Sequence, residues 1–159
     1  MEEVLQLLGE DARLTASQIA ERVGRPEAEV REEIKRLEST GVIRKYKAII
    51  DWERAGVEHV YGFIEVRVSP ERGVGFDAVA ERIMGFPEVH SLYLMSGTYD
   101  LLVVVQGQSM KEVAFFVAEK LAPLDHVLST ATHFVLKRYK VDGDELTERA
   151  EVRRLPVTP

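Results

Sequence analysis

Two short apolar runs lie in the middle of the chain, at residues 89–95 and 101–105, and the polar stretch Ser96–Asp100 separates them. Strands rich in Val, Leu and Tyr that flank a Gly-containing break are typical of a β-hairpin. Three consecutive valines, residues 103–105, predict that the second strand is buried on both faces. The turn either only connects the two strands, or it is a site where backbone N–H groups and the Asp100 carboxylate bind a ligand.

The N-terminal third follows a helical period and predicts three short helices in about 40 residues. Thr15 is a plausible N-cap of the second helix, which Gly24 ends. Pro26 suits the first turn of the third helix, and Gly41 ends it. The apolar stripes of these two helices are Ala16, Ile19, Ala20 and Val23, and then Val30, Ile34 and Leu37.

Two helices joined by a tight Gly-containing turn, followed by the alternating run Arg44–Ile50, are typical of a helix-turn-helix with a strand or wing behind it. A small helical bundle with no DNA partner is the alternative. In the DNA-binding interpretation, the third helix enters a major groove. Its candidate phosphate or base contacts are Arg25, Arg31, Lys35 and Arg36, and Arg44, Lys45 and Lys47 flank the DNA backbone. Their alternative role is a solvated helix face.

From His59 the period changes to two, which predicts a strand up to Ser69-Pro70. After Gly73–Gly75 a helix follows, with its apolar face on Phe76, Val79, Ala80, Ile83 and Met84, and Gly85 ends it. The hairpin comes next. Ser109 then caps a second helix that buries Val113, Phe116, Val117 and Leu121, and Pro123 ends that helix. A last strand is predicted over Val127–Tyr139.

This order, strand, helix, strand, strand, helix, strand, predicts a ferredoxin-like α+β sandwich with two helices on one face of an antiparallel sheet. At least one of the three valines must face away from the helices. The simplest way to bury that face is pairing with a second subunit, which we therefore expect. The predicted domains are a winged helix-turn-helix at 1–50, a linker at 51–58, an oligomerisation and effector domain at 59–140, and a charged tail at 141–159. Trp52, the single tryptophan, is expected to be a packing anchor.

The composition of the chain argues against several classes of protein function. The chain has 159 residues, no cysteine and a formal charge of −6, which argues against thiolate chemistry and against nonspecific coating of nucleic acid. The first 50 residues are the least acidic part, with nine Lys and Arg against ten Asp and Glu. Neither a signal peptide nor a membrane span is recognisable, so a cytoplasmic protein is expected.

Three motifs in order resemble the Lrp/AsnC family of feast/famine transcriptional regulators. They are Ser17-Gln18-Ile19-Ala20 through Gly24, the run from Arg36 through Gly41-Val42-Ile43 to Asp51, and Gly97-Thr98-Tyr99-Asp100-Leu101, which is similar to the family's G-x-Y-D turn. The resemblance implies a winged helix-turn-helix regulator of an operator in double-stranded DNA, and it adds Ser17 and Gln18 to the DNA-binding candidates. It also implies a homodimer that assembles into tetramers or octamers. An amino acid effector would bind between dimers near the turn.

The third helix departs from that family at Arg31-Glu32-Glu33, where relatives usually carry arginines aimed at DNA. An effector-binding assembly protein with weakened or lost DNA binding is therefore the main alternative function. In the effector interpretation, the turn's N–H groups meet a carboxylate and Asp100 meets an ammonium. The candidate effector residues are Ser96, Gly97, Thr98, Tyr99 and Asp100, completed by Ser129, Thr130 and Thr132 of a neighbouring subunit. A structural turn in which Asp100 bonds its own backbone is the alternative.

Catalysis has little support in the sequence. The four histidines show no metal-ligand spacing, and His126 and His133 would face opposite sides of one strand. No nucleophile elbow, P-loop or dinucleotide motif is present, so no cofactor and no catalytic residue is predicted. Some relatives of this fold are enzymes of tetrapyrrole metabolism, which leaves a haem-type pocket as a minor alternative.

Overall fold

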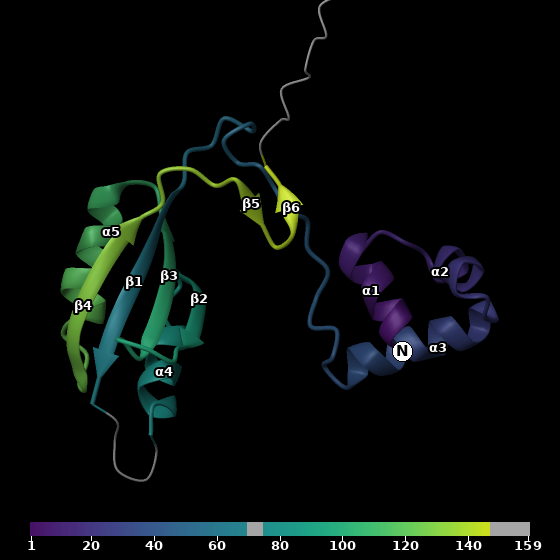
Figure 1. The fold of residues 1–159 in the computed structure, drawn as a ribbon, viewed down its shortest axis with the longest axis horizontal. Coiled ribbons are helices and arrows are strands. Elements are labelled where there is room, and N and C mark those ends of the chain that lie inside the picture. Colours follow the sequence, from purple (N-terminus) through teal and green to yellow (C-terminus); the bar gives the residue numbers. More distant parts are fainter. Residues whose placement is uncertain (70–74, 147–159) are drawn as a thin grey trace, which may run out of the picture. The chain divides into compact units, whose positions relative to one another are not determined.

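The computed structural model describes residues 1–69 and 75–146, and the chain divides into two compact units, Met1–Ile50 and Asp51–Pro159 (Figure 1). Pro70 and Gly73, which bound the predicted first strand and the helix after it, lie outside the described part, and so does the tail from residue 147 onward. Among the described residues, no helix combines the length and apolar character needed to cross a membrane.

The first unit contains α1 (Glu2–Glu10), α2 (Ala16–Val23) and α3 (Glu27–Ser39). Thr15 caps α2 in a full capping box: its side chain accepts from the Gln18 N–H, and the Gln18 side chain accepts from the Thr15 N–H. Gly24 follows α2 at φ 67°, a left-handed conformation that glycine adopts without strain. Apolar residues of all three helices form one core, namely Val4, Leu8, Ile19, Ala20 and Val30.

The sequence predicts a strand or wing at Arg44–Ile50, and the prediction of a strand is wrong. These residues carry no regular secondary structure and are exposed. Their alternating pattern is that of a strand, but a strand also needs a neighbour to complete its backbone hydrogen bonds. The described part of the chain supplies no such neighbour for this segment.

The second unit is a four-stranded antiparallel sheet with the order β2-β3-β1-β4 (Figure 1). The strands are β1 (Val60–Val68), β2 (Val89–Leu94), β3 (Leu101–Gly107) and β4 (Val127–Phe134). Helix α4 (Asp77–Met84) connects β1 to β2, and α5 (Met110–Phe116), which continues into the π-helical turn η1 (Val117–Leu121), connects β3 to β4. The ferredoxin-like fold and the hairpin at Ser96–Asp100 are thus confirmed.

Register assigns each strand residue to one of two faces. Ile64 pairs with Val103, and both side chains are fully buried in a core shared with α4 and α5. Gly62 lies under α5, where an added Cβ would come within 2.8 Å of Val113 Cγ1. Glycine is therefore required for this close approach of helix to sheet. Phe63 and its partner Val104 face the other way, as predicted for one of the three valines.

Several expected details differ. β4 ends at Phe134 rather than at Tyr139, and Leu136 beyond it is 90% exposed because the chain has left the sheet. The helical period predicts Met84 on the apolar face of its helix, but its side chain is 59% exposed. Met84 is the last residue of α4. His126 precedes β4 with φ 71°, so it does not share a strand with His133.

The beginning of the predicted tail has structure of its own. Lys140–Val141 (β5) and Asp144–Glu145 (β6) pair as a two-stranded ribbon around the Asp142-Gly143 turn. Asp142 and Gly143 both have positive φ, 49° and 96°, as the tight turns of two-residue hairpins require. A short hairpin therefore occupies a region where an unstructured extension was expected.

Candidate nucleic-acid interface and effector turn

The outward face of α3 is defined by Ala28, Glu32, Lys35 and Ser39, whose spacing of four, three and four places them on one stripe opposite the buried Val30. Glu32 is 71% exposed and stands in the middle of this stripe. The centre of this exposed stripe therefore carries a carboxylate.

Both cations near this stripe are paired within the helix. Arg31 bonds to Glu27 one turn earlier, and Lys35 Nζ lies 2.8 Å from Glu32 Oε1. The hydrogen bond from Lys35 lowers the pKa of Glu32, so the Glu32 carboxyl is ionised at neutral pH. All four side chains are well exposed, and such surface pairs contribute at most about 1 kcal/mol each.

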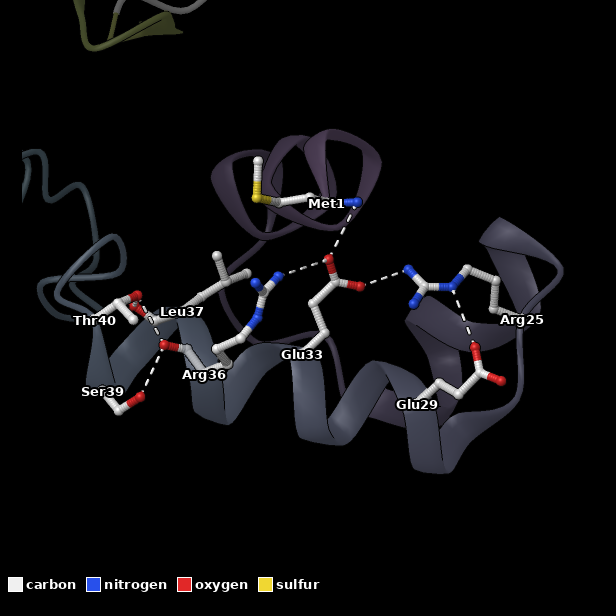
Figure 2. Close-up of polar contacts among 8 residues, drawn as sticks. All are labelled: Met1, Arg25, Glu29, Glu33, Arg36, Leu37, Ser39 and Thr40. Atoms are coloured by element: carbon white, nitrogen blue, oxygen red, sulfur yellow. Dashed lines mark hydrogen bonds and ion pairs between the residues drawn. The ribbon is translucent and has the colours of Figure 1, made fainter.

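Glu33 forms a different kind of contact, because its side chain is only 10% exposed. Figure 2 shows its carboxylate between the Met1 ammonium at 3.2 Å, Arg25 Nη1 at 2.5 Å and, more distantly, Arg36 Nη2 at 3.9 Å. The hydrogen bonds from Arg25 and from the Met1 ammonium lower the pKa of Glu33. The same hydrogen bond to Glu33 raises the pKa of Arg25. Glu33 thus ties the start of α1 and the α2–α3 turn to α3.

Among the predicted DNA contacts, Arg25 and Arg36 are therefore drawn toward Glu33, and Gln18 is engaged in the α2 cap. Ser17 is exposed at the start of α2. The sequence does not reveal Glu33 as the organising residue of this unit. Its only sequence signal was its place at i+3 from Val30 on the flank of the buried stripe, which does not reveal that Met1 and Arg25 converge on it.

Arg44, Lys45 and Lys47 form the other cationic group, on the exposed segment after α3. Within residues 1–69 and 75–146, no ion pair involves any of the three. Between them, Tyr46 donates its hydroxyl to Glu38 Oε1 at 2.9 Å and so attaches the segment to α3. Burial, followed by this contact with Glu38, raises the pKa of Tyr46. The segment thus presents three uncompensated cations beside α3.

Two hydrogen bonds of Asp100, the last residue of the hairpin turn, tie the turn to the end of β1. Asp100 Oδ2 accepts a hydrogen bond from the Val68 N–H at 2.9 Å, and the Asp100 N–H donates to the Val66 carbonyl at 3.0 Å. The Asp100 carboxylate therefore bonds β1 and not its own turn, so the prediction of a purely local Asp100 contact is wrong. The contact of Asp100 with a ligand ammonium stays a prediction. Its second oxygen, Oδ1, has no hydrogen bond within the described chain.

Arg67 is the functional candidate that the sequence analysis overlooked. Its Nε donates to the Thr98 carbonyl at 2.9 Å, which places the guanidinium beside the turn. No further hydrogen bond or ion pair engages its two terminal nitrogens within the described residues, and the side chain is exposed. An arginine near the end of a strand gives no hint of this role, because 31 residues separate it from Thr98.

The three polar residues of β4 do not share a face. Thr130 and Thr132 pair with Val66 and Ile64 and so face the helices, whereas Ser129 pairs with Arg67 on the open face. The prediction that all three complete one site is therefore wrong, because alternation along a strand separates neighbours. Only Ser129 lies on the same face as Arg67.

That open face is largely apolar near its centre. Phe63 is 38% exposed and Tyr93 52% exposed, and Leu102 and Val104 lie between them on β3. Towards β4 the face becomes polar, where His133 Nε2 lies 3.4 Å from Glu65 Oε1. No described element covers this surface.

Two of the four histidines, His59 and His90, pack against aromatic rings. His59 contacts Trp52 edge-on at 5.2 Å between ring centroids, and both His59 and His90 approach the ring of Tyr61. The guanidinium of Arg138 lies over the same Tyr61 ring at 4.6 Å. No group of three or more His, Asp or Glu suited to a metal ion occurs within the described residues. Trp52 is half-buried and packs against His59, and its role as an anchor at a domain or subunit seam stays a prediction.

Hollows on the surface do not coincide with the turn. A groove of about 350 Å³ runs along α5 between Glu88, Phe115 and Lys120, and none of its lining residues belongs to Ser96–Asp100. The effector candidates of one chain thus form an open surface.

Comparison with known proteins agrees with this geometry. Residues 2–44 match the model of a winged helix-turn-helix DNA-binding domain, and residues 62–144 match the Lrp/AsnC ligand-binding domain. The chain belongs to the Lrp/AsnC family. An uncharacterised HTH-type transcriptional regulator of Bacillus subtilis, YugG, is 50% identical over 99% of this chain and 95% of its own length.

The chain is also similar to a transcriptional activator and to a transcriptional regulator solved with a ligand. The proline dehydrogenase transcriptional activator of Rhizobium radiobacter is 27% identical over 88% of this chain and 89% of its own. A transcriptional regulator of Neisseria meningitidis, solved as a complex with L-Met, has a TM-score of 0.71 and 28% identity, covering 87% of this chain and 89% of its own. The family resemblance is confirmed, and this Lrp/AsnC protein is a DNA-binding transcriptional regulator.

Proposed function

We propose that this Lrp/AsnC regulator binds an amino acid at the Ser96–Asp100 turn and transmits that binding to an operator through a homo-oligomer. The observation that carries the proposal is the placement of Arg67. Its Nε is anchored on Thr98, and its two terminal nitrogens face solvent beside the turn. A guanidinium in this state is suited to bind a carboxylate with two parallel hydrogen bonds.

The same turn offers a partner for an ammonium. Asp100 uses Oδ2 to hold the Val68 N–H and has Oδ1 available. A guanidinium and a carboxylate beside one turn match the two charges of an α-amino acid. The L-Met complex of the Neisseria relative adds support for this ligand class. We assign the carboxylate to Arg67 and the ammonium to Asp100, with Gly97, Thr98 and Tyr99 shaping the site.

The open sheet face supports a dimer. Phe63, Tyr93 and Leu102 form an apolar surface that no described element of the chain covers, and apolar surface of this kind is stabilised by burial. A second copy related by a two-fold axis would cover it with the same patch. Dimerisation on this face, followed by assembly of dimers into tetramers or octamers, would bring turns of neighbouring subunits together and close the open effector surface.

A thermal-shift screen against the standard amino acids tests the effector. We expect one or a few of them to raise the melting temperature of the wild type and to leave Arg67→Gln unchanged. Arg82→Gln is the matched control, because Arg82 is also an exposed arginine of this domain but lies near Asp125 instead of the turn. A flat screen with wild type would overturn the effector proposal, and equal loss in both variants would overturn the role of Arg67.

Operator binding is expected to depend on the exposed cations after α3. We expect the triple variant Arg44→Gln, Lys45→Gln, Lys47→Gln to bind its own promoter region more weakly than wild type, with a salt dependence shallower by about 0.9 per lost cation per bound copy. Lys111→Gln, Lys137→Gln, Lys140→Gln in the other unit removes the same charge and serves as control. The alternative function, an assembly protein that no longer touches DNA, rests on the ion pairs that engage Arg31 and Lys35 on α3, and it predicts no binding by wild type at any salt concentration.

A further inference from the structure

The most unusual feature of the DNA-binding unit is that α3 carries a net negative charge. Between Glu27 and Ser39 it holds five glutamates and three cations, a formal charge of −2. DNA affinity depends on neutralising phosphates, and carboxylates at the same surface oppose it. The arrangement of these glutamates therefore sets how strongly α3 can bind.

The five glutamates have different surroundings. Glu29 and Glu38 contact residues outside α3, namely Arg25 and Tyr46. Glu33 is 10% exposed and joins three parts of the helix-turn-helix, so it has a structural role. Glu27 and Glu32 are 43% and 71% exposed, and among the described residues each pairs only with a cation of its own helix, Arg31 or Lys35. Nothing in the packing of the domain requires these two carboxylates.

We propose that Glu27 and Glu32 act as brakes on DNA affinity. Each holds a cation that would otherwise contact a phosphate, and Glu32 places its own charge at the centre of the outward stripe. Arg44, Lys45 and Lys47 then supply most of the phosphate contact. This inference rests on the proposed DNA-binding role of α3 and the following segment.

As a consequence, a single DNA-binding domain would bind DNA weakly, whereas the assembled oligomer would bind DNA well. When several weak domains are linked, the second binding event becomes intramolecular, and the overall affinity depends steeply on how many copies are joined. DNA occupancy would thus follow the assembly state. A strongly basic α3 would bind DNA as a dimer or even as a monomer, and a change in assembly would alter occupancy much less.

The double variant Glu27→Gln, Glu32→Gln tests the brake in the full chain. Fluorescence anisotropy is measured on a duplex of its own promoter region and on a shuffled duplex, from about 50 to about 200 mM salt. We expect binding about ten-fold tighter on both duplexes, with a slope steeper by about 0.9 for each freed cation per bound copy. Size-exclusion chromatography confirms that both proteins have the same assembly state.

The control is Glu2→Gln, Glu10→Gln, which changes the net charge equally on exposed positions of α1. It should shift affinity less than about two-fold, because surface charges away from the contact are screened by salt. Unchanged affinity and slope in the α3 variant would overturn the brake while leaving DNA binding intact. Weaker binding on the promoter duplex alone would also overturn it and would identify Glu32 as a reader of cytosine. No binding by either protein would instead refute the DNA-binding role itself, and the brake with it.

Discussion

Asp100 holds the end of β1, because its Oδ2 accepts the Val68 N–H at 2.9 Å across 32 residues of sequence. The N–H group is part-buried, and the carboxylate satisfies it. The residue that matches the last position of the family's G-x-Y-D turn thus has a structural role in addition to the ligand contact proposed for its other oxygen.

Asp100→Ala should therefore lower the free energy of unfolding by about 1–3 kcal/mol, the cost of leaving a buried donor unsatisfied. Asp100→Asn retains an acceptor and should lose less than half as much. Urea denaturation of the full chain measures both. Asp125→Ala removes an exposed carboxylate from the same unit and should change the free energy of unfolding by less than about 0.5 kcal/mol. If Asp100→Ala behaved like Asp125→Ala, the bond to Val68 would contribute nothing.

The Glu33 contacts predict a pH dependence of the helix-turn-helix. Its folded-state pKa is lowered below the ordinary value of 4.5, so its stabilising contribution is present above that value and is lost as the pH falls through the folded-state pKa. Glu33→Gln should lower the melting temperature near neutral pH, and this difference should shrink in acid. Melting curves by circular dichroism from about pH 7 to about pH 3 measure it. Glu10→Gln, an exposed carboxylate of α1, should show no such convergence.

The contact between Gly62 and α5 predicts a steric effect. A methyl group at this position would lie 2.8 Å from Val113 Cγ1 and 3.2 Å from Val105 Cγ2, so Gly62→Ala should destabilise the effector domain by about 1–3 kcal/mol. Gly9→Ala is the matched control, since no atom lies within 4 Å of its added Cβ, and it should be neutral or slightly stabilising. Combining Gly62→Ala with Val113→Ala should cost less than the sum of the two single changes, because the second removes the clash.

The open sheet face predicts a change in assembly. Phe63→Glu places a charge on an apolar surface that is proposed to pair with itself, so we expect the protein to shift toward monomer in sedimentation velocity. Phe115→Glu adds the same charge at a phenylalanine that is 50% exposed on α5, and it should leave the assembly unchanged. Dimers in both variants would show that subunits associate through another surface.

Local chemistry in the sequence was enough to predict most of the elements. The alternating residues of β1, the helical period of α2 and α3, the Thr15 cap and the Gly24 end all depend on neighbours within a few residues. The order of the elements then specified the ferredoxin-like sandwich, because few topologies satisfy it. The errors fall where local pattern is insufficient: residues 44–50 alternate but have no strand partner, and Tyr139 lies beyond the end of β4.

The sequence by itself thus determined the two domains, the family and the position of the turn. Tertiary structure decided what the polar residues do. Arg67 meets Thr98, Asp100 meets Val68, and Glu33 meets Met1 and Arg25, and each pair is set by the register of strands or the packing of helices. The physical reason is that a charged side chain has the same local propensity whether it is solvated or paired, so its role depends on what folding brings within hydrogen-bonding distance.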